Sequence, residues 1–348
     1  MSKPLFTIGV TGLNAIDSPG SGVGVIRAIR DSQDFEVRII GLVYESLEPG
    51  IYMEGIADKS YMIPYPSAGR ESLLKRLAYI HEKEQLDLLI PNFDAELYNF
   101  ISLGPEFRKM NIRTFMPSLS KLESIDKLHL HEFGEKYGYK IPKTHFLSGP
   151  SQIEDIETDF DYPVVVKGKF YEAYIAHNAE QVTGFFHKLN AKWGLPVIIQ
   201  EFIKGTEIDI AALGDGNGKT IGAIPMRKLY ITDKGKAWSG IVIDDPSLLK
   251  LTRKFTRDSR WKGGFELEIM RTEKEELYIM EINPRFPAWI YTTAAAGQNL
   301  PASLVNLAMG LPVSSFRKYE VGTMFVRYAW DNITHIREFE KISNYGER

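Results

Sequence analysis

Three polar residues near the end of one predicted strand, Glu281, Asn283 and Arg285, are the residues of this chain best placed to do chemistry. The strand begins at Leu277, and its side chains alternate between two faces. Pro284 cannot donate a backbone hydrogen bond within a sheet, so we expect the strand to end at Asn283. It then delivers a carboxylate, an amide oxygen and a guanidinium together. The two oxygen ligands suit a hard cation such as Mg²⁺, which also takes waters and phosphate oxygens.

A second strand with acidic residues precedes this one. Phe265–Ile269 alternates strictly between apolar and acidic residues, and Arg271–Glu276 is typical of a hairpin turn. The hairpin places Glu268 beside Glu281, and Glu266 remains an alternative to Glu268 as the first acidic ligand. The whole pattern could also be an exposed polar strand face followed by an unrelated arginine.

The hairpin resembles the metal-binding hairpin of the ATP-grasp superfamily, in the form found in the large subunit of carbamoyl phosphate synthetase. The resemblance implies that Glu268, Glu281 and Asn283 hold two Mg²⁺ ions, with Mn²⁺ as an alternative, on the phosphates of ATP. It also implies that Arg285 lies near the γ-phosphate or an acyl phosphate.

Lysines at two further positions match the same superfamily. Lys127 lies inside a helix predicted over Ser120–Tyr137, and Lys167 closes the β-branched strand Tyr162-Pro-Val-Val-Val-Lys167. The resemblance implies that both reach the phosphates of ATP, where lysine acts as a compact point charge. From the residues alone, a helical lysine is more often a solvated surface group. Residues 168–173 contain one glycine where relatives have a glycine-rich loop, and we expect Lys169 to supply charge there.

A strand over Val197–Phe202 and the segment after it match the nucleotide hinge of the superfamily. The resemblance implies that Glu201, Phe202 and Ile203 form the adenine hinge and that Glu207 binds the ribose. Gln200 is an alternative to Glu201 in facing the adenine amino group. Alternatively, the segment is a plain strand that ends in a Lys-Gly turn. This interpretation explains Gly205 but not the matching lysine and glutamate residues elsewhere in the chain.

One choice between residues and one departure from the superfamily pattern concern the reaction centre. Arg227 and Lys228 follow a predicted hairpin, and adjacent bases usually point to opposite sides, so we expect only one of them to approach the γ-phosphate. The synthetase has a histidine where this chain has Trp238, in Ala237-Trp-Ser-Gly240. Because an indole cannot replace a titrating imidazole, Trp238 disfavours a one-carbon substrate.

The first third of the chain alternates strand and helix patterns, which predicts a small doubly wound parallel sheet. The predicted elements are the strands Leu5–Thr11, Phe35–Val43 and Leu86–Pro91 and the helices Val25–Arg30 and Glu71–Glu84.

Loops after these strands carry further polar residues. Glycines that include Gly22 and Gly24 open the first helix, a setting that suits an anion, but a third glycine in phase is absent. Asp17, Asn92 and Asp94 follow strands, where α/β sheets place ligands. Turn formation or helix capping explains these three residues equally well.

The expected fold class is therefore mixed α/β and α+β, with a doubly wound parallel-sheet domain followed by a two-lobed ATP-grasp fold. We expect the first domain over residues 1–117, a small lobe over 118–204 and a large lobe with the metal-binding hairpin over 205–348.

Composition sets broad limits on partners and location. The 348 residues carry a net charge of −3, with 44% hydrophobic and 25% charged residues. This balance provides no basic field for nucleic acid or an anionic membrane. The chain lacks cysteine, which excludes disulfides and a thiol nucleophile and fits a cytoplasmic protein. We see no secretory signal and no apolar run long enough for a membrane span.

The resemblance implies an ATP-dependent carboxylate–amine ligase that forms an acyl phosphate and then an amide. Its substrates would be a small-molecule or peptide carboxylate and an amine, and a homodimer remains open. The alternatives are an enzyme that activates bicarbonate and a non-enzymatic nucleotide-binding protein.

Overall fold

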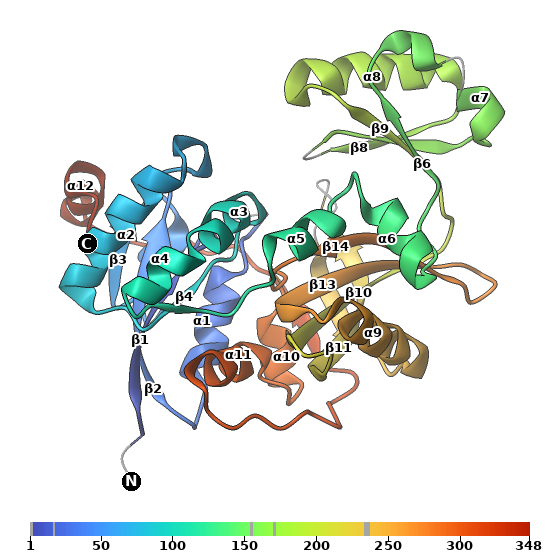
Figure 1. Ribbon diagram of the computed structural model, residues 1–348. Coiled ribbons are helices and arrows are strands. Elements are labelled where there is room, and N and C mark those ends of the chain that lie inside the picture. Colours follow the sequence, from blue (N-terminus) through green and yellow to red (C-terminus); the bar gives the residue numbers. More distant parts are fainter. Residues whose placement is uncertain (1–2, 17, 154–155, 170–171, 233–236) are drawn as a thin grey trace. The chain divides into compact units, whose positions relative to one another are not determined.

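The computed structural model describes residues 3–16, 18–153, 156–169, 172–232 and 237–348 (Figure 1). These residues form two compact units. Unit 1 comprises residues 1–122, 209–267 and 283–348, and unit 2 comprises residues 123–208 and 268–282.

Unit 1 begins with a five-stranded parallel sheet in the order β3-β2-β1-β4-β5. The register places Gly9 of the central strand opposite Ile40 on one side and Leu89 on the other. The strands of this sheet are β1 (Leu5–Val10), β2 (Glu36–Val43), β3 (Lys59–Met62), β4 (Leu88–Ile90) and β5 (Arg113–Thr114). The helices between them are α1 (Gly22–Arg30), α2 (Arg70–Glu84), α3 (Asp94–Ser102) and α4 (Gly104–Lys109).

Apolar side chains cover both faces of this sheet. Ile39 and Val43 of β2 share a buried cluster with Ile26 of α1. Ile40 and Leu42 of the same strand point to the opposite face, into a cluster formed with α2, α3 and α4. Figure 1 shows these three helices along one side of the sheet. Helices on both faces of a parallel sheet define a doubly wound domain, which confirms the prediction for this part of the chain.

The later segments of unit 1 contribute most of a six-stranded sheet in the order β14-β13-β10-β11-β12-β15. Its strands are β10 (Thr206–Asp215), β11 (Thr220–Ile231), β12 (Ala237–Val242), β13 (Lys262–Arg271), β14 (Leu277–Asn283) and β15 (Met324–Val326). The helices are α9 (Pro246–Ser259), α10 (Tyr291–Ala295), α11 (Leu300–Met309) and α12 (Ile336–Tyr345). The strand β14 ends at Asn283 as predicted, and Asp245 caps α9 by accepting from the backbone of Ser247 and Leu248.

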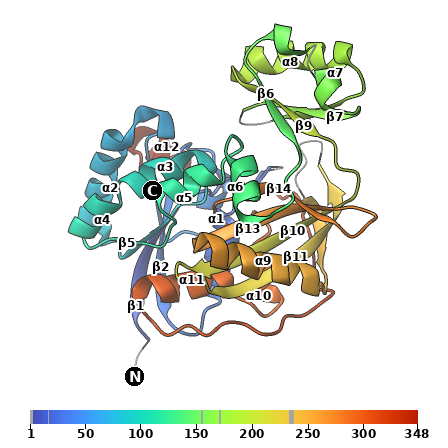
Figure 2. The ribbon, with the colours of Figure 1, turned by 45° about the vertical axis from the view of Figure 1, so that its right-hand side comes forward.

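Unit 2 contains a four-stranded sheet in the order β6-β9-β7-β8 (Figure 2). The pairs β6–β9, β9–β7 and β7–β8 are all antiparallel, with Val165 of β7 opposite Ile175 and Gln200. One face packs against α8 through a buried cluster that includes Val182 and Phe186. The elements are α5 (Leu119–Ser124, which starts in unit 1), α6 (Leu130–Tyr137), β6 (Thr144–Leu147), α7 (Ile156–Asp159), β7 (Val164–Lys167), β8 (Ala173–Ala176), α8 (Ala179–Trp193) and β9 (Val197–Glu201).

The single helix expected over Ser120–Tyr137 is wrong, because the structure has two shorter helices there, α5 and α6. Asp126 causes the interruption. Its carboxylate accepts hydrogen bonds from the backbone N–H groups of Leu128 and His129, both at 2.9 Å. Aspartate favours such local bonds over a helix interior. Lys127 therefore lies in the turn between the helices.

None of the helices that the structure describes combines the length and the apolar character needed to cross a bilayer. The parallel doubly wound domain together with the antiparallel sheets matches the fold class expected from the sequence.

Candidate active site

Unit 2 contains a pocket that brings together residues predicted to bind a nucleotide. Lys127, Lys167 and Gln200 line it, with apolar walls from Ile198 and Met280. Its enclosed volume is about 20 Å³, roughly the space of one water, so a larger ligand would extend beyond it. The pocket therefore offers ammonium groups and an amide beside apolar surface, the mixture that orients a small polar ligand.

Gln200 faces this pocket, whereas Glu201 is turned elsewhere. The amide oxygen Oε1 of Gln200 is buried and accepts no hydrogen bond from any residue that the structure describes. Its Nε2 lies 3.4 Å from the Thr144 hydroxyl. The Glu201 carboxylate instead accepts from the backbone N–H of Lys143 at 3.1 Å. Since an unsatisfied buried acceptor is costly, Gln200 fits a ligand that donates an N–H group, and this geometry favours it over Glu201.

Lys167 ends β7 at the pocket, and its ammonium group is poorly solvated. Burial lowers the pKa of Lys167, and the positive charge of Lys127 acts in the same direction. The carboxylates of Glu281, Glu268 and Glu207 oppose this shift. A cation that water solvates poorly gains more from an incoming anion than an exposed cation does.

Acidic side chains of unit 2 lie near these lysines. Carboxylate oxygens of Glu207 on β10 and Glu268 on β13 come within 4.8 Å of one another. Glu281 on β14 lies 3.7 Å from the Lys127 ammonium. Each of these carboxylates is partly exposed. Neighbouring carboxylates repel one another, and a hard divalent cation that accepts oxygen ligands relieves this repulsion. The donor set of unit 2 therefore fits Mg²⁺.

The other residues predicted to bind the nucleotide differ in their exposure to solvent. Phe202 is half-buried and Ile203 is buried, directly after β9, while Lys169 is exposed. Phe170 and Tyr171, which belong to the glycine-poor segment 168–173, lie outside the described residues.

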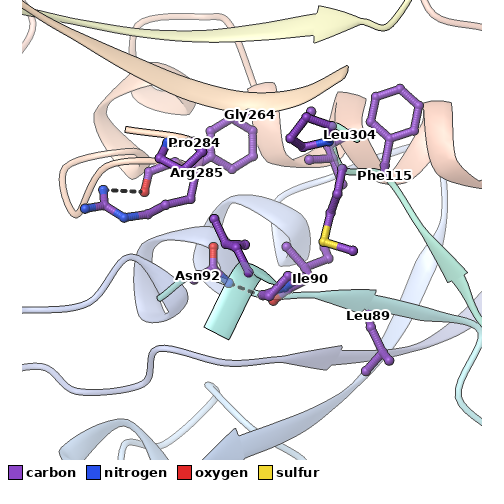
Figure 3. Close-up of a pocket in the computed structure, with 14 residues that line it drawn as sticks. Leu89, Ile90, Asn92, Phe115, Gly264, Pro284, Arg285 and Leu304 are labelled. Atoms are coloured by element: carbon purple, nitrogen blue, oxygen red, sulfur yellow. Dashed lines mark hydrogen bonds between the residues drawn. The ribbon is translucent and has the colours of Figure 1, made fainter. Parts of the chain in front are cut away.

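In unit 1, Asn283 at the end of β14 contacts the buried Glu266 of β13. The Asn283 side-chain N–H₂ donates to the Glu266 carboxylate at 2.9 Å. Arg285 follows two residues later, and its guanidinium donates to Asp94 at 2.9 and 3.2 Å. The guanidinium also donates to the backbone carbonyl of Phe286 at 3.2 Å, and Figure 3 shows Arg285 beside Pro284 among the residues that line a pocket. Both predicted residues thus have several fixed neighbours.

The structure separates the adjacent bases on β11. The Lys228 side chain is 7% exposed and its ammonium lies 3.2 Å from the buried carboxylate of Asp209, while Arg227 is exposed. The two therefore point to opposite sides, as the sequence indicated. Asp209 follows Glu207 on β10, and the two share a face of that strand. This Glu-x-Asp spacing was a signal that the sequence analysis did not use.

The loops of the parallel sheet show mainly structural roles. Asn92 is buried, and its side-chain amide donates to the carbonyls of Thr11 and Ile90. A Cβ at Gly22 would lie 2.1 Å from the Thr11 carbonyl oxygen, so this glycine allows a close approach of two backbone segments. Asp94 contacts Arg285, and Asp17 lies outside the described residues.

Glu96 is a buried residue that the sequence analysis did not single out. Its carboxylate accepts hydrogen bonds from the Thr11 and Tyr44 hydroxyls and from the backbone N–H of Asn92 and Phe93. Burial raises the pKa of Glu96 to about 7. These bonds join the segments that follow three parallel strands, so Glu96 stabilises the loops at that edge of the sheet.

Comparisons with known proteins find a matching family model and distant relatives. A family model described as "ATP-grasp in the biosynthetic pathway with Ter operon" matches residues 195–329. The chain is 24% identical over 243 residues to the carbamoyl phosphate synthase large chain of Clostridium beijerinckii. The aligned region covers 66% of this chain and 22% of the relative. The Pyrococcus furiosus counterpart is 20% identical over 290 residues, 77% of this chain and 27% of the relative. The chain thus spans about a quarter of the length of these curated relatives.

Several solved structures share the fold. A biotin carboxylase–β,γ-ATP complex from Campylobacter jejuni has a TM-score of 0.70 at 15% identity, covering 91% of this chain and 74% of that one. A biotin carboxylase domain dimer of Hydrogenobacter thermophilus 2-oxoglutarate carboxylase, with MgADP, ADP and bicarbonate, has a TM-score of 0.68 at 17% identity (90% and 72% covered). The N5-carboxyaminoimidazole ribonucleotide synthetase from Thermus thermophilus has a TM-score of 0.66 at 16% identity (88% and 79% covered).

The chain has the ATP-grasp fold. It is distantly similar to the carbamoyl phosphate synthase large chain and to the biotin carboxylase and N5-carboxyaminoimidazole ribonucleotide synthetase structures.

Proposed function

We propose that this protein is an ATP-dependent carboxylate–amine ligase that forms an acyl phosphate and then an amide, releasing ADP and phosphate. The observation that carries the proposal is the pocket of unit 2. It combines the unsatisfied amide oxygen of Gln200 with the ammonium groups of Lys127 and Lys167. Adenine could donate its amino group to Gln200, and the lysines could bind the phosphates.

Acidic and amide side chains would hold the metal that accompanies ATP. Glu268, Glu281 and Asn283 are oxygen donors of the kind that Mg²⁺ prefers, and Glu207 is assigned to the ribose. The metal would neutralise negative charge on the phosphates. Of the adjacent bases, Lys228 is engaged with Asp209, so Arg227 is the better candidate for an approach to the γ-phosphate.

The chemistry needs no nucleophile from the protein. A substrate carboxylate oxygen attacks the γ-phosphorus, the bond to the β–γ bridging oxygen breaks, and ADP leaves. The amine nitrogen then attacks the acyl carbon, the carbon–oxygen bond to phosphate breaks, and the nitrogen loses a proton. The residues act by alignment and by stabilising charge, a role proposed here for Lys167 and Arg285.

Activation of bicarbonate is the second candidate, since one similar structure contains bicarbonate with MgADP. Trp238 opposes it, because a half-buried indole stands on β12 where the resembled synthetase has a histidine. A third reading, a nucleotide-binding protein without catalysis, does not explain why several metal-type ligands and Arg285 occur together.

The test is an ADP-release screen with Mg²⁺, ATP and pairs of carboxylates and amines, with bicarbonate as one of the carboxylates. We expect ADP release that requires both a carboxylate and an amine. Glu281→Gln should reduce it by at least 10-fold, because it removes one charged ligand from a hard-cation site. A folded Glu281→Gln protein with unchanged turnover would contradict the metal assignment. ADP release with bicarbonate as the sole active carboxylate would favour the second candidate.

A further inference from the structure

The strand β15 of unit 1 and the residues after it, 324–335, form an edge segment with exposed apolar side chains. β15 pairs with β12 and ends the six-stranded sheet. Alternate residues of the segment are between 52% and 84% exposed, namely Met324, Val326, Tyr328 and Trp330. Side chains two positions apart point the same way in an extended chain, and the Tyr328 and Trp330 rings meet edge to face with centroids 6.1 Å apart. Such an exposed apolar row marks an interaction surface.

The backbone of the edge segment has an open side that suits another strand. The Thr323 carbonyl and the Arg327 N–H both bond to β12, at 2.9 Å each. Because antiparallel strands direct alternate residues toward one neighbour, the backbone groups of Met324 and Val326 face the open edge. The backbone groups of residues 328–334 bond to no residue that the structure describes. Lysine and proline, which commonly protect such edges, are both missing from the edge segment.

Two charged residues of the edge segment have opposite signs. Arg327 is half-buried, its Nε donates to the Ala237 carbonyl at 2.9 Å, and burial lowers the pKa of its guanidinium. No carboxylate among the described residues forms an ion pair with Arg327. Asp331, four positions later, is exposed. A poorly solvated guanidinium gains more from an incoming carboxylate than an exposed one does, so Arg327 suits an acidic group that approaches the open edge.

We propose that the edge segments of two copies of this chain pair antiparallel about a two-fold axis at Ala329, which makes the protein a homodimer. This register sets Arg327 of one copy opposite Asp331 of the second copy, and the two-fold axis produces the contact twice. It also sets Tyr328 opposite Trp330, and opposed aromatic residues stabilise a sheet. A shift of the axis by one residue in either direction leaves both charges unmatched. The inference does not depend on the proposed ligase activity.

Charge reversal in the full chain tests this register. In Arg327→Asp two aspartates face each other at both contacts, and in Asp331→Arg two arginines do. We expect the wild-type protein to sediment as a dimer at micromolar concentration, measured by sedimentation velocity. Each variant should have a dimer dissociation constant at least about 10-fold higher, because opposed like charges are costly. An equimolar mixture of the two variants should recover dimers, because every contact in a mixed dimer joins an aspartate to an arginine.

Tyr328→Ser tests the apolar row separately. We expect it to raise the dimer dissociation constant at least about 5-fold, the loss typical of an aromatic residue at an interface. Tyr345→Ser is the matched control, because Tyr345 is 75% exposed against 78% for Tyr328 but lies on α12, outside the edge segment. Circular dichroism shows which variants fold. If Arg327→Asp does not fold once its bond to Ala237 is lost, Asp331→Arg and Tyr328→Ser carry the test.

Three results would overturn the inference. A wild-type protein that stays monomeric would show that the edge segment does not pair with a second copy, and co-sedimentation of that monomer with phosphatidylcholine vesicles would assign the apolar row to a lipid surface. Wild-type dimerisation in both Asp331→Arg and Tyr328→Ser would place the dimer interface elsewhere. A mixture of folded Arg327→Asp and Asp331→Arg proteins that stays monomeric would reject the register about Ala329.

Discussion

At the scale of single residues, the neighbours of a charged side chain indicate whether it is available to a ligand or already forms an ion pair within the protein. Lys228 is buried against the carboxylate of Asp209, so its charge is already compensated. Lys167 instead combines burial, which lowers its pKa, with several more distant carboxylates. This difference makes Lys167 the lysine most strongly expected to bind a phosphate.

We predict that Lys167→Ala weakens ATP affinity by about one to two orders of magnitude, the loss expected for a hydrogen bond to a charged group. Isothermal titration calorimetry with Mg²⁺·ATP measures the change. Lys188→Ala is the control, because Lys188 is exposed on α8 of the same unit. Equal affinity of wild type and Lys167→Ala would show that Lys167 does not bind a phosphate of ATP.

The pKa of Lys167 predicts a pH dependence for the same binding reaction. Burial lowers the pKa in the free protein, and a bound phosphate should raise it. At a pH between the two values, binding therefore takes up a proton, and affinity falls as pH rises through the lowered pKa. Calorimetry in buffers of different ionisation enthalpy should detect this uptake in wild type and not in Lys167→Ala. Uptake of the same size in both proteins would assign the proton to another group.

The sequence predicts candidate ligands from local spacing, but it does not predict all of the residues that those side chains contact. The spacing of Glu281, Asn283 and Arg285 is visible within one strand end. Asp94, the ion-pair partner of Arg285, lies 191 positions away, and no local pattern links the two. Trp289 is close in sequence, but its bond to Glu266 depends on how β13 pairs with β14.

At the scale of elements, hairpins and strand ends place the candidate ligands. The predicted hairpin appears as β13 and β14, because alternation and Pro284 define it locally. The predicted long helix around Lys127 fails because one aspartate side chain offers the backbone a competing partner.

The turn before β10 requires a glycine because two backbone segments approach closely there. A Cβ at Gly205 would lie 2.1 Å from the carbonyl oxygen of Arg271 at the end of β13. Only a residue without a side chain allows this approach of the two strands, and Glu207 and Glu268 lie on the same strands.

We predict that Gly205→Ala destabilises the protein by about 1–3 kcal/mol, as overpacking does, and weakens Mn²⁺ binding in the presence of ADP. Thermal melting and metal titration measure the two effects. Gly149→Ala is the control, because a Cβ there meets nothing within 4 Å. If Gly205→Ala melts and binds metal like Gly149→Ala, the turn does not set the position of Glu268, the residue on β13 proposed to bind the metal.

At the scale of the whole molecule, the chain combines a doubly wound sheet with the lobes of an ATP-grasp fold. The fold class was predictable because strand-like and helix-like sequence patterns alternate in the first third of the chain, and short strands rich in β-branched residues follow. The acceptor was not predictable, because loops on one scaffold vary freely. The chain also spans only about a quarter of the carbamoyl phosphate synthases it resembles, so their substrates do not transfer to it.

The central claim is that a carboxylate takes the γ-phosphate of ATP before an amide forms, and oxygen-18 in the substrate carboxylate tests it most directly. One labelled oxygen leaves with the phosphate when the acyl phosphate is broken. With the carboxylate and amine found by the screen, we predict ADP as the nucleotide product and oxygen-18 in inorganic phosphate, detected by phosphorus NMR. AMP and pyrophosphate as products, or label that stays entirely in the organic product, would contradict the claim.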